Sequence, residues 1–320
     1  MILRMNRNPS IELYRIGLMF GICLLRSMSF GLYGSAFAGN VLASCVVGFA
    51  FISGWFGVKF SWWKLAKLYG IGLYAAAVFG VLSVMAGTVP DRISAGILAY
   101  KKLTHGFWFL HAYAVMMILA PMVDALLDRK ASAIIPFLVM VWIWGFGRTL
   151  PFGSDLLPQT DGLAAYGGMT LTAVYAAARV CCKFGIDEWL KLKWLVVLLS
   201  VLVILTGIGL GDYNSPFAFA LAATCFLIVK RVRLPAFFGR VVIFTAPSMF
   251  SVYLLHTNDV GGAFIKKCEW WMAGNMGLCP VFAILATAAV VFFCALALDM
   301  PRRALSDVVE KRFFGMWLER

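Results

Sequence analysis

Three basic or titratable side chains interrupt long apolar stretches of this sequence: Arg26, His105 and His256. An imidazole changes its charge near neutral pH, so either histidine can take up or release a proton. A guanidinium keeps its proton at any physiological pH, so Arg26 can bind an anion or stabilise a developing oxyanion but cannot act as a base. Groups of this kind are costly inside apolar surroundings, which makes the three residues candidates for a functional site.

A second group of charges lies closer to the N-terminus. Lys64 and Lys67 are three residues apart, so a helix would place both on one face. Such a pair either belongs to a functional site or only sets the orientation of the chain across a membrane. Arg15 begins the first apolar stretch, eleven residues before Arg26, which corresponds to about 16 Å along a helix.

The eight cysteines and three histidines show no spacing that resembles a zinc site, and no metal is expected. Cys268 and Cys279 lie in or beside a predicted outer loop, where an oxidising compartment would permit a disulfide. Two free thiols are an equally good interpretation, because a disulfide requires a specific geometry.

Composition identifies the class of protein. Hydrophobic residues make up 62% of the 320 residues and charged residues only 13%, against about 45–50% and about 25% in soluble domains. Because about 20 apolar residues cross a bilayer, the sequence predicts an all-α polytopic membrane protein with about ten transmembrane helices, at residues 11–30, 36–58, 66–87, 104–127, 133–147, 162–181, 193–211, 214–229, 241–257 and 278–299. We take residues 1–320 as a single domain, with an amphipathic cytoplasmic tail at 300–320.

The positions of the basic residues predict the orientation. With the N-terminus inside the cell, most of the 28 Lys and Arg residues fall in cytoplasmic connections, as the positive-inside rule requires. Both termini are therefore expected in the cytoplasm, and the net charge of +13 requires no nucleic-acid partner. In this orientation Arg26, His105 and His256 lie in the outer half of the membrane, whereas Lys64 and Lys67 lie at its cytoplasmic side.

Six short motifs, in order along nearly the whole chain, resemble those of the membrane acyltransferase-3 family. They are residues 11–15 (IELYR), 51–56 (FISGWF), 64–67 (KLAK), 105–110 (HGFWFL), 214–217 (NSPF) and 251–256 (SVYLLH). The resemblance implies a bundle of ten spans with both ends in the cytoplasm.

Members of this family transfer an acetyl or other short acyl group from cytoplasmic acyl-CoA to a hydroxyl of a glycan or small acceptor. The resemblance implies an O-acyltransferase of the bacterial cytoplasmic membrane, expected to transfer acetyl, with acyl-CoA as donor substrate and no bound cofactor. Its other implied partners are an envelope or exported polysaccharide and the lipid bilayer. The implied roles are catalysis by His105, His256 and Arg26, acyl-CoA binding by Arg15, Lys64, Lys67 and Ser53, and substrate binding by Trp108, Tyr253 and Asn214.

The sequence departs from the family pattern at two places. Arg26 stands where the family has a histidine, and Lys64 and Lys67 replace a pair of arginines. Two interpretations stay open: an acyltransferase in which His105 or His256 takes the proton, or a catalytically degenerate relative that binds a ligand or assists export. A secondary transporter is less expected, because residues 1–150 and 151–320 show no repeat and the buried charge lies away from the midplane.

Overall fold

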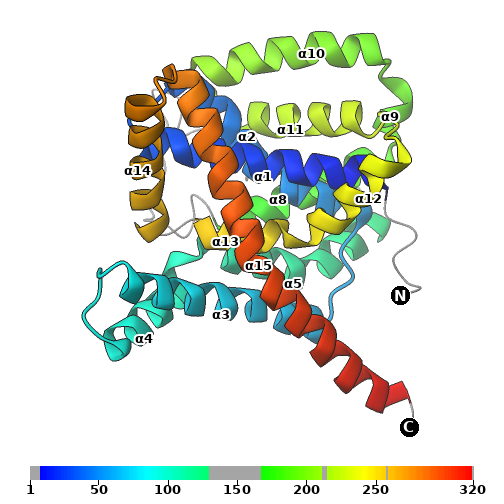
Figure 1. The fold of residues 1–320 in the computed structure, drawn as a ribbon. Helices are drawn as coiled ribbons and strands as arrows, with labels where there is room; N and C mark the ends of the chain where they lie inside the picture. The colour runs from blue at the N-terminus through cyan, green and yellow to red at the C-terminus, as the bar shows by residue number, and fades with distance from the viewer. Residues whose placement is uncertain (1–7, 130–166, 211–214, 257–258, 319–320) are drawn as a thin grey trace, which may run out of the picture.

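The computed structural model describes residues 8–129, 167–210, 215–256 and 259–318. Every regular element in this part of the chain is helical (Figure 1). The elements are α1 (Pro9–Phe30), α2 (Ala36–Phe56), α3 (Trp62–Met85), α4 (Arg92–Lys101), η1 (Lys102–Gly106), α5 (Trp108–Arg129), α8 (Gly168–Lys183), α9 (Ile186–Trp189), α10 (Leu192–Leu205), η3 (Thr206–Leu210), α11 (Pro216–Val229), α12 (Ala236–Thr245), η4 (Ala246–Ser248), α13 (Met249–His256), α14 (Asp259–Asn275) and α15 (Pro280–Leu318).

Six of the described helices are long and apolar enough to cross a membrane: Ala36–Phe56, Trp62–Met85, Trp108–Asp128, Leu192–Gly209, Ala236–His256 and Pro280–Ser306. Apolar side chains point outward along them, and Leu73, Met122 and Phe293 are 61%, 62% and 64% exposed. Helices satisfy their own backbone hydrogen bonds and can therefore present such side chains to lipid. The chain is a multi-pass membrane protein.

The other predicted segments are not among these six helices. The described parts of the predicted segments 11–30, 162–181 and 214–229 lie in or beside α1, α8 and α11, of which α8 and α11 have 16 and 14 residues. The segment predicted at 133–147 lies outside the described residues. One boundary differs from the prediction, because α5 begins only at Trp108. The residues of the predicted tail continue the helix α15 through Pro301 to Leu318.

The helix α2 lies at the centre of the bundle and packs against α1, α8 and α11. A Cβ atom at Gly54 would lie 2.4 Å from the backbone oxygen of Tyr175, so glycine allows α2 and α8 to approach this closely. On the other side, the rings of Phe51 and Trp55 contact Phe226 of α11 at centroid distances of 5.2 and 5.1 Å. This packing fixes α2 against both neighbours.

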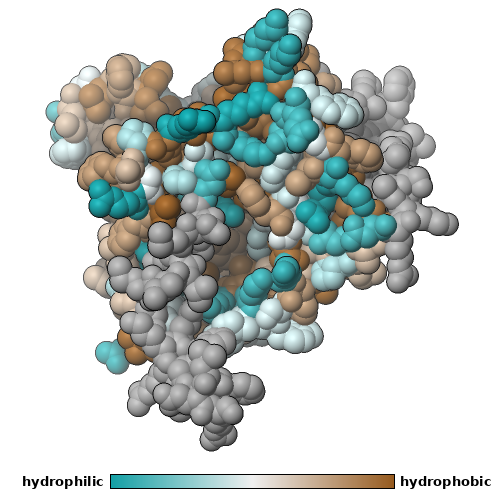
Figure 2. Space-filling model, turned by 90° about the vertical axis from the view of Figure 1, so that its right-hand side faces the viewer, coloured by the Kyte–Doolittle hydropathy of each residue, from teal (hydrophilic) through white to brown (hydrophobic). Residues whose placement is uncertain are grey.

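A second group of helices encloses the site described below. The short helix α13 contacts α1, α3, α14 and α15. In Figure 1 α15 crosses the front of the molecule, α3 lies below it, and α14 runs along the left edge. The face at the right of that view, where α1 begins and α9 lies, carries many hydrophilic side chains among apolar ones (Figure 2).

Candidate functional site

His256 is the last residue of α13, and only 3% of its surface is exposed. Its Nδ1 atom lies 2.8 Å from the backbone oxygen of Val252. A carbonyl oxygen can only accept, so Nδ1 carries the proton and Nε2 keeps a free lone pair. Within the described part of the chain, Nε2 has no hydrogen-bond partner. The imidazole is therefore held in the tautomer that a general base requires.

The His256 side chain borders a cavity of about 440 Å³ between α3, α13, α14 and α15. The cavity wall is apolar apart from His256 and Cys294, and its other lining residues are Leu82, Leu255, Val260, Gly261, Phe264, Val291, Ala295, Ala297 and Leu298. Phe264 and Leu298 are 42% and 37% exposed, so the cavity opens to the outside of the bundle. The His256 side chain thus borders an accessible apolar space, while its unpaired Nε2 atom is itself buried.

Arg26 and Tyr253 both interact with the His256 imidazole. The Arg26 guanidinium on α1 acts electrostatically on the His256 imidazole. The Tyr253 ring meets the imidazole edge to face, with 5.9 Å between centroids. The same tyrosine packs against Phe109 at 5.1 Å, and Phe109 in turn contacts Trp108 at 5.6 Å. Three predicted site residues, His256, Tyr253 and Trp108, are therefore linked by ring contacts that run through Phe109.

Ser53 joins this group from the side of α2. Its hydroxyl shares a hydrogen bond of 2.9 Å with the hydroxyl of Tyr113. The Tyr113 ring packs against Phe109 at 5.9 Å and against Phe250 at 6.1 Å. The contacts of Ser53 thus lie with the aromatic residues near His256, whereas the sequence grouped Ser53 with the lysines.

His105 lies apart from this group. It is exposed on the π-helical turn η1, and its Nδ1 atom shares a hydrogen bond of 2.7 Å with Thr104 Oγ1. None of the contacts described for His105 reaches Arg26 or His256. His111, rather than His105, contacts neighbouring helical residues through both ring nitrogens. Its Nε2 atom lies 2.9 Å from the Leu103 carbonyl oxygen, and its Nδ1 atom lies 3.2 Å from the Tyr69 hydroxyl.

The two lysines at the start of α3 have different surroundings. Lys64 Nζ donates to the backbone oxygen of Lys59 at 2.8 Å. Lys67 lies over the Trp63 ring at 5.4 Å and borders a second cavity, of about 270 Å³, together with Arg302 and Ser306 of α15. Lys67 is therefore the better placed of the two to bind an anion, and Arg302 is a cation that our reading of the sequence missed.

Arg302 could have been found from its spacing to Asp299, three residues earlier on the same helix. Its Nη2 atom donates to Asp299 Oδ2 at 3.0 Å, and its Nε atom donates to Oδ1 at 2.5 Å. The buried carboxylate of Asp299 therefore holds the guanidinium at the edge of the second cavity.

Arg15 is not brought to either cavity by the described contacts. Arg15 Nη1 forms an ion pair of 3.0 Å with Glu12, one turn earlier on α1. Asn214 lies outside the described residues.

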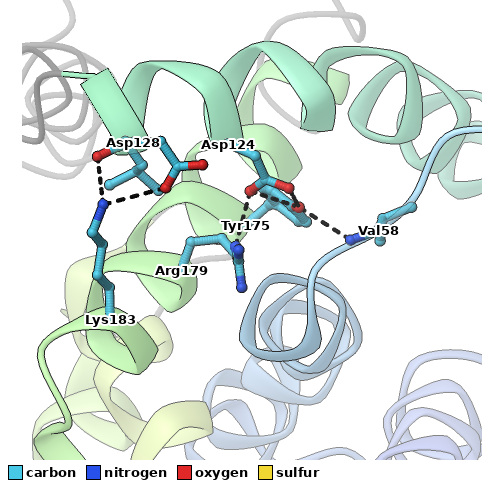
Figure 3. A network of polar contacts seen from close by, with 7 residues as sticks. Val58, Asp124, Asp128, Tyr175, Arg179 and Lys183 are labelled. Atoms are coloured by element: carbon cyan, nitrogen blue, oxygen red, sulfur yellow. Dashed lines mark hydrogen bonds and ion pairs between the residues drawn. The ribbon is translucent and has the colours of Figure 1, made fainter.

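A polar network fixes the loop that precedes α3 (Figure 3). The backbone N–H of Val58 donates to the Tyr175 hydroxyl at 3.1 Å, and this hydroxyl donates to Asp124 Oδ2 at 3.0 Å. Arg179 Nε donates to the other oxygen of Asp124 at 2.9 Å. One turn further on, Lys183 pairs with Asp128 at 3.4 Å. The network ties α5 and α8 to the segment from which Lys64 and Lys67 extend.

All eight cysteines are free thiols, including Cys268 and Cys279, which corresponds to the second of the two predicted alternatives. In the described ranges no group of His, Cys, Asp and Glu side chains could hold a metal ion.

Comparison with known proteins gives no match to a protein-family model, a curated protein or a solved structure.

Proposed function

We propose that this protein is a membrane-bound O-acyltransferase that moves an acyl group from cytoplasmic acyl-CoA to a hydroxyl of an envelope or exported polysaccharide. The observation that carries the proposal is the His256 imidazole, which is buried, fixed in one tautomer and unpaired at Nε2 beside an open cavity. The motifs shared with the acyltransferase-3 family give the reaction class. We place the protein in the bacterial cytoplasmic membrane, with ten spans and both termini in the cytoplasm.

In the proposed reaction His256 Nε2 accepts the proton of the acceptor hydroxyl while the hydroxyl oxygen attacks the thioester carbonyl. A C–O bond forms, the C–S bond breaks, and the departing thiolate takes the proton from the imidazolium, so the products are an ester and free CoA. Arg26 stabilises the oxyanion of the tetrahedral intermediate through its positive charge. A positioned base contributes about 10²–10⁴ in rate to such a step.

The donor would bind with its phosphates at the second cavity. Lys67 supplies an ammonium and Arg302 a guanidinium at the edge of this cavity, and both groups bind phosphate oxygens well. In the proposed orientation this end of α3 faces the cytoplasm, where acyl-CoA is present, and His256 lies towards the outer side, where the polysaccharide passes.

The test is acyl transfer by the purified protein in sealed vesicles, with labelled acyl-CoA inside and a pool of cell-envelope glycans outside. Activity that His256→Ala removes and His105→Ala leaves intact supports the proposal. If His105→Ala removes the activity instead, the general base is His105 on η1. Absence of activity in the unaltered chain, with activity in Arg26→His, would identify a degenerate relative that binds acyl-CoA without transferring it.

A further inference from the structure

The size and lining of the His256 cavity bear on which acyl group is transferred. Its volume of about 440 Å³ falls within the range of about 300–1,000 Å³ that is usual for sites of drug-sized ligands. Its wall offers a ligand one imidazole, one thiol and otherwise apolar contacts. An acetyl group would fill little of this cavity, and a sugar that filled it would lose the hydrogen bonds of its hydroxyls, so only the reacting hydroxyl of the acceptor is expected at His256.

The position of His256 on this wall adds a second, independent indication. Its side chain is 97% buried, since 3% is exposed, and Nε2 has no partner among the described residues. A buried nitrogen with a free lone pair is costly unless a ligand group supplies a hydrogen bond. The proton donor that Nε2 lacks is, in the proposed reaction, the acceptor hydroxyl, which leaves the apolar part of the cavity to the acyl group.

The two cavities follow each other along the same pair of helices. The second cavity is lined by Lys67 and Tyr74 of α3 and by Arg302 of α15. The His256 cavity is lined by Leu82, later on α3, and by Leu298, earlier on α15. The Tyr74 hydroxyl donates to the Leu298 carbonyl at 2.6 Å, so one contact divides the two spaces. Between Lys67 and Leu82, fifteen residues of α3 correspond to about 22 Å.

We propose that the donor is the CoA thioester of a medium- or long-chain fatty acid, and that its hydrocarbon chain occupies the His256 cavity. This inference rests on the proposed function and replaces the expected acetyl group. The CoA phosphates lie at Lys67 and Arg302, the pantetheine arm follows α3 and α15 past Tyr74, and the thioester carbonyl lies at His256. The acyl carbon exchanges its bond to sulfur for a bond to the acceptor oxygen, as in the reaction above.

The mouth of the cavity favours a chain of this kind. It opens between α14 and α15, at Phe264 and Leu298, and α15 can cross a membrane. In a bilayer this opening faces hydrocarbon, so a fatty acyl chain can enter without crossing water. The acyl chains of phospholipids share this chemistry, and the experiment therefore supplies the same chain from both sources.

The experiment measures ester formation by the full-length protein in vesicles with acetyl-CoA, octanoyl-CoA or a phospholipid with labelled octanoyl chains. Each buried methylene strengthens binding about fourfold, so octanoyl-CoA should surpass acetyl-CoA in kcat/KM by more than about a hundredfold. Ala297→Phe narrows the cavity and should remove most of this preference. Ala304→Phe, the same change on the same helix at a residue outside the His256 cavity, should keep the preference.

The outcomes separate this inference from the function on which it rests. Equal kcat/KM values for acetyl-CoA and octanoyl-CoA would overturn the inference and leave the acyltransferase in place. A preference for octanoyl-CoA that survives in Ala297→Phe would overturn the assignment of the chain to this cavity. Transfer from the phospholipid alone would overturn the thioester as the source. Silence with every donor would overturn the proposed function itself.

Discussion

The Tyr74 hydroxyl of α3 donates a hydrogen bond of 2.6 Å to the Leu298 carbonyl of α15, at the boundary between a cationic and an apolar cavity. One cavity carries Lys67 and Arg302, and the other ends at His256. The arrangement suits an amphiphilic donor with an anionic head and an apolar chain. The contact also joins two helices on the open side of the bundle.

Tyr74→Phe should raise the KM for acyl-CoA about fivefold and leave kcat unchanged. The substitution keeps the ring and removes the donor, and a hydrogen bond of this kind contributes about 1 kcal/mol. Loss of this hydrogen bond affects the position of α15 relative to α3 and leaves the reacting atoms unchanged. Initial rates over a range of donor concentrations provide the measurement, and a fall in kcat at unchanged KM would contradict it.

Lys67→Ala should raise the KM for acyl-CoA, whereas Lys64→Ala should have little effect. Lys67 borders the second cavity, while Lys64 donates to the Lys59 carbonyl outside it. The two substitutions remove the same charge three residues apart, so each serves as the control for the other. The difference should shrink as salt is raised, because exposed charges are screened. Equal effects of both variants would mean that the KM for acyl-CoA depends only on the overall charge at the start of α3.

Tyr175→Phe should destabilise the protein by about 1–3 kcal/mol, the usual cost of leaving a buried polar group without its partner. The Tyr175 hydroxyl accepts from the Val58 N–H and donates to Asp124, and phenylalanine does neither. Thermal unfolding in detergent reports the change, with Tyr100→Phe as a control because that ring is 67% exposed on α4. Unaltered stability would mean that the network in Figure 3 does not hold the loop before α3.

Glu269 of α14 should make stability depend on pH. Burial raises the pKa of this carboxyl above its ordinary value, while hydrogen bonds from the Leu32 and Tyr33 backbone N–H groups oppose the rise. The folded chain thus binds the proton more tightly than the unfolded chain, and stability should increase as pH falls through the raised pKa. Glu269→Gln should remove most of this dependence. The check is the unfolding temperature between about pH 4 and pH 8.

Gly31→Ala provides a steric test of the same contact. A Cβ atom at this position would lie 2.0 Å from Glu269 Oε2, so the carboxylate or the end of α1 must move. We expect a lower unfolding temperature than for Gly17→Ala, where no atom lies within 4 Å of the added carbon. Equal unfolding temperatures would show that Glu269 moves aside at no cost.

Much of the fold follows from the sequence, because runs of apolar residues predict membrane helices directly. The electrostatic interaction of Arg26 with His256 was also predictable, since the expected orientation places both residues in the outer half of the membrane. Sequence could not predict that His105 points outward, because this depends on the π-helical turn before α5. Nor could it predict that Arg302 lies beside Lys67, because the pairing of α3 with α15 is set by tertiary packing between distant segments.

The central claim is that His256 Nε2 is the base, and chemical rescue tests it most directly. His256→Ala enlarges a cavity that already opens to the outside, so added imidazole can reach the vacated position. We predict that acyl transfer falls about 10²–10⁴-fold in His256→Ala and recovers in part with imidazole, while His105→Ala stays active and does not respond. The opposite result would contradict the assignment of His256 as the base. In that case His105→Ala would lose activity and recover it with added imidazole, whereas His256→Ala would stay active.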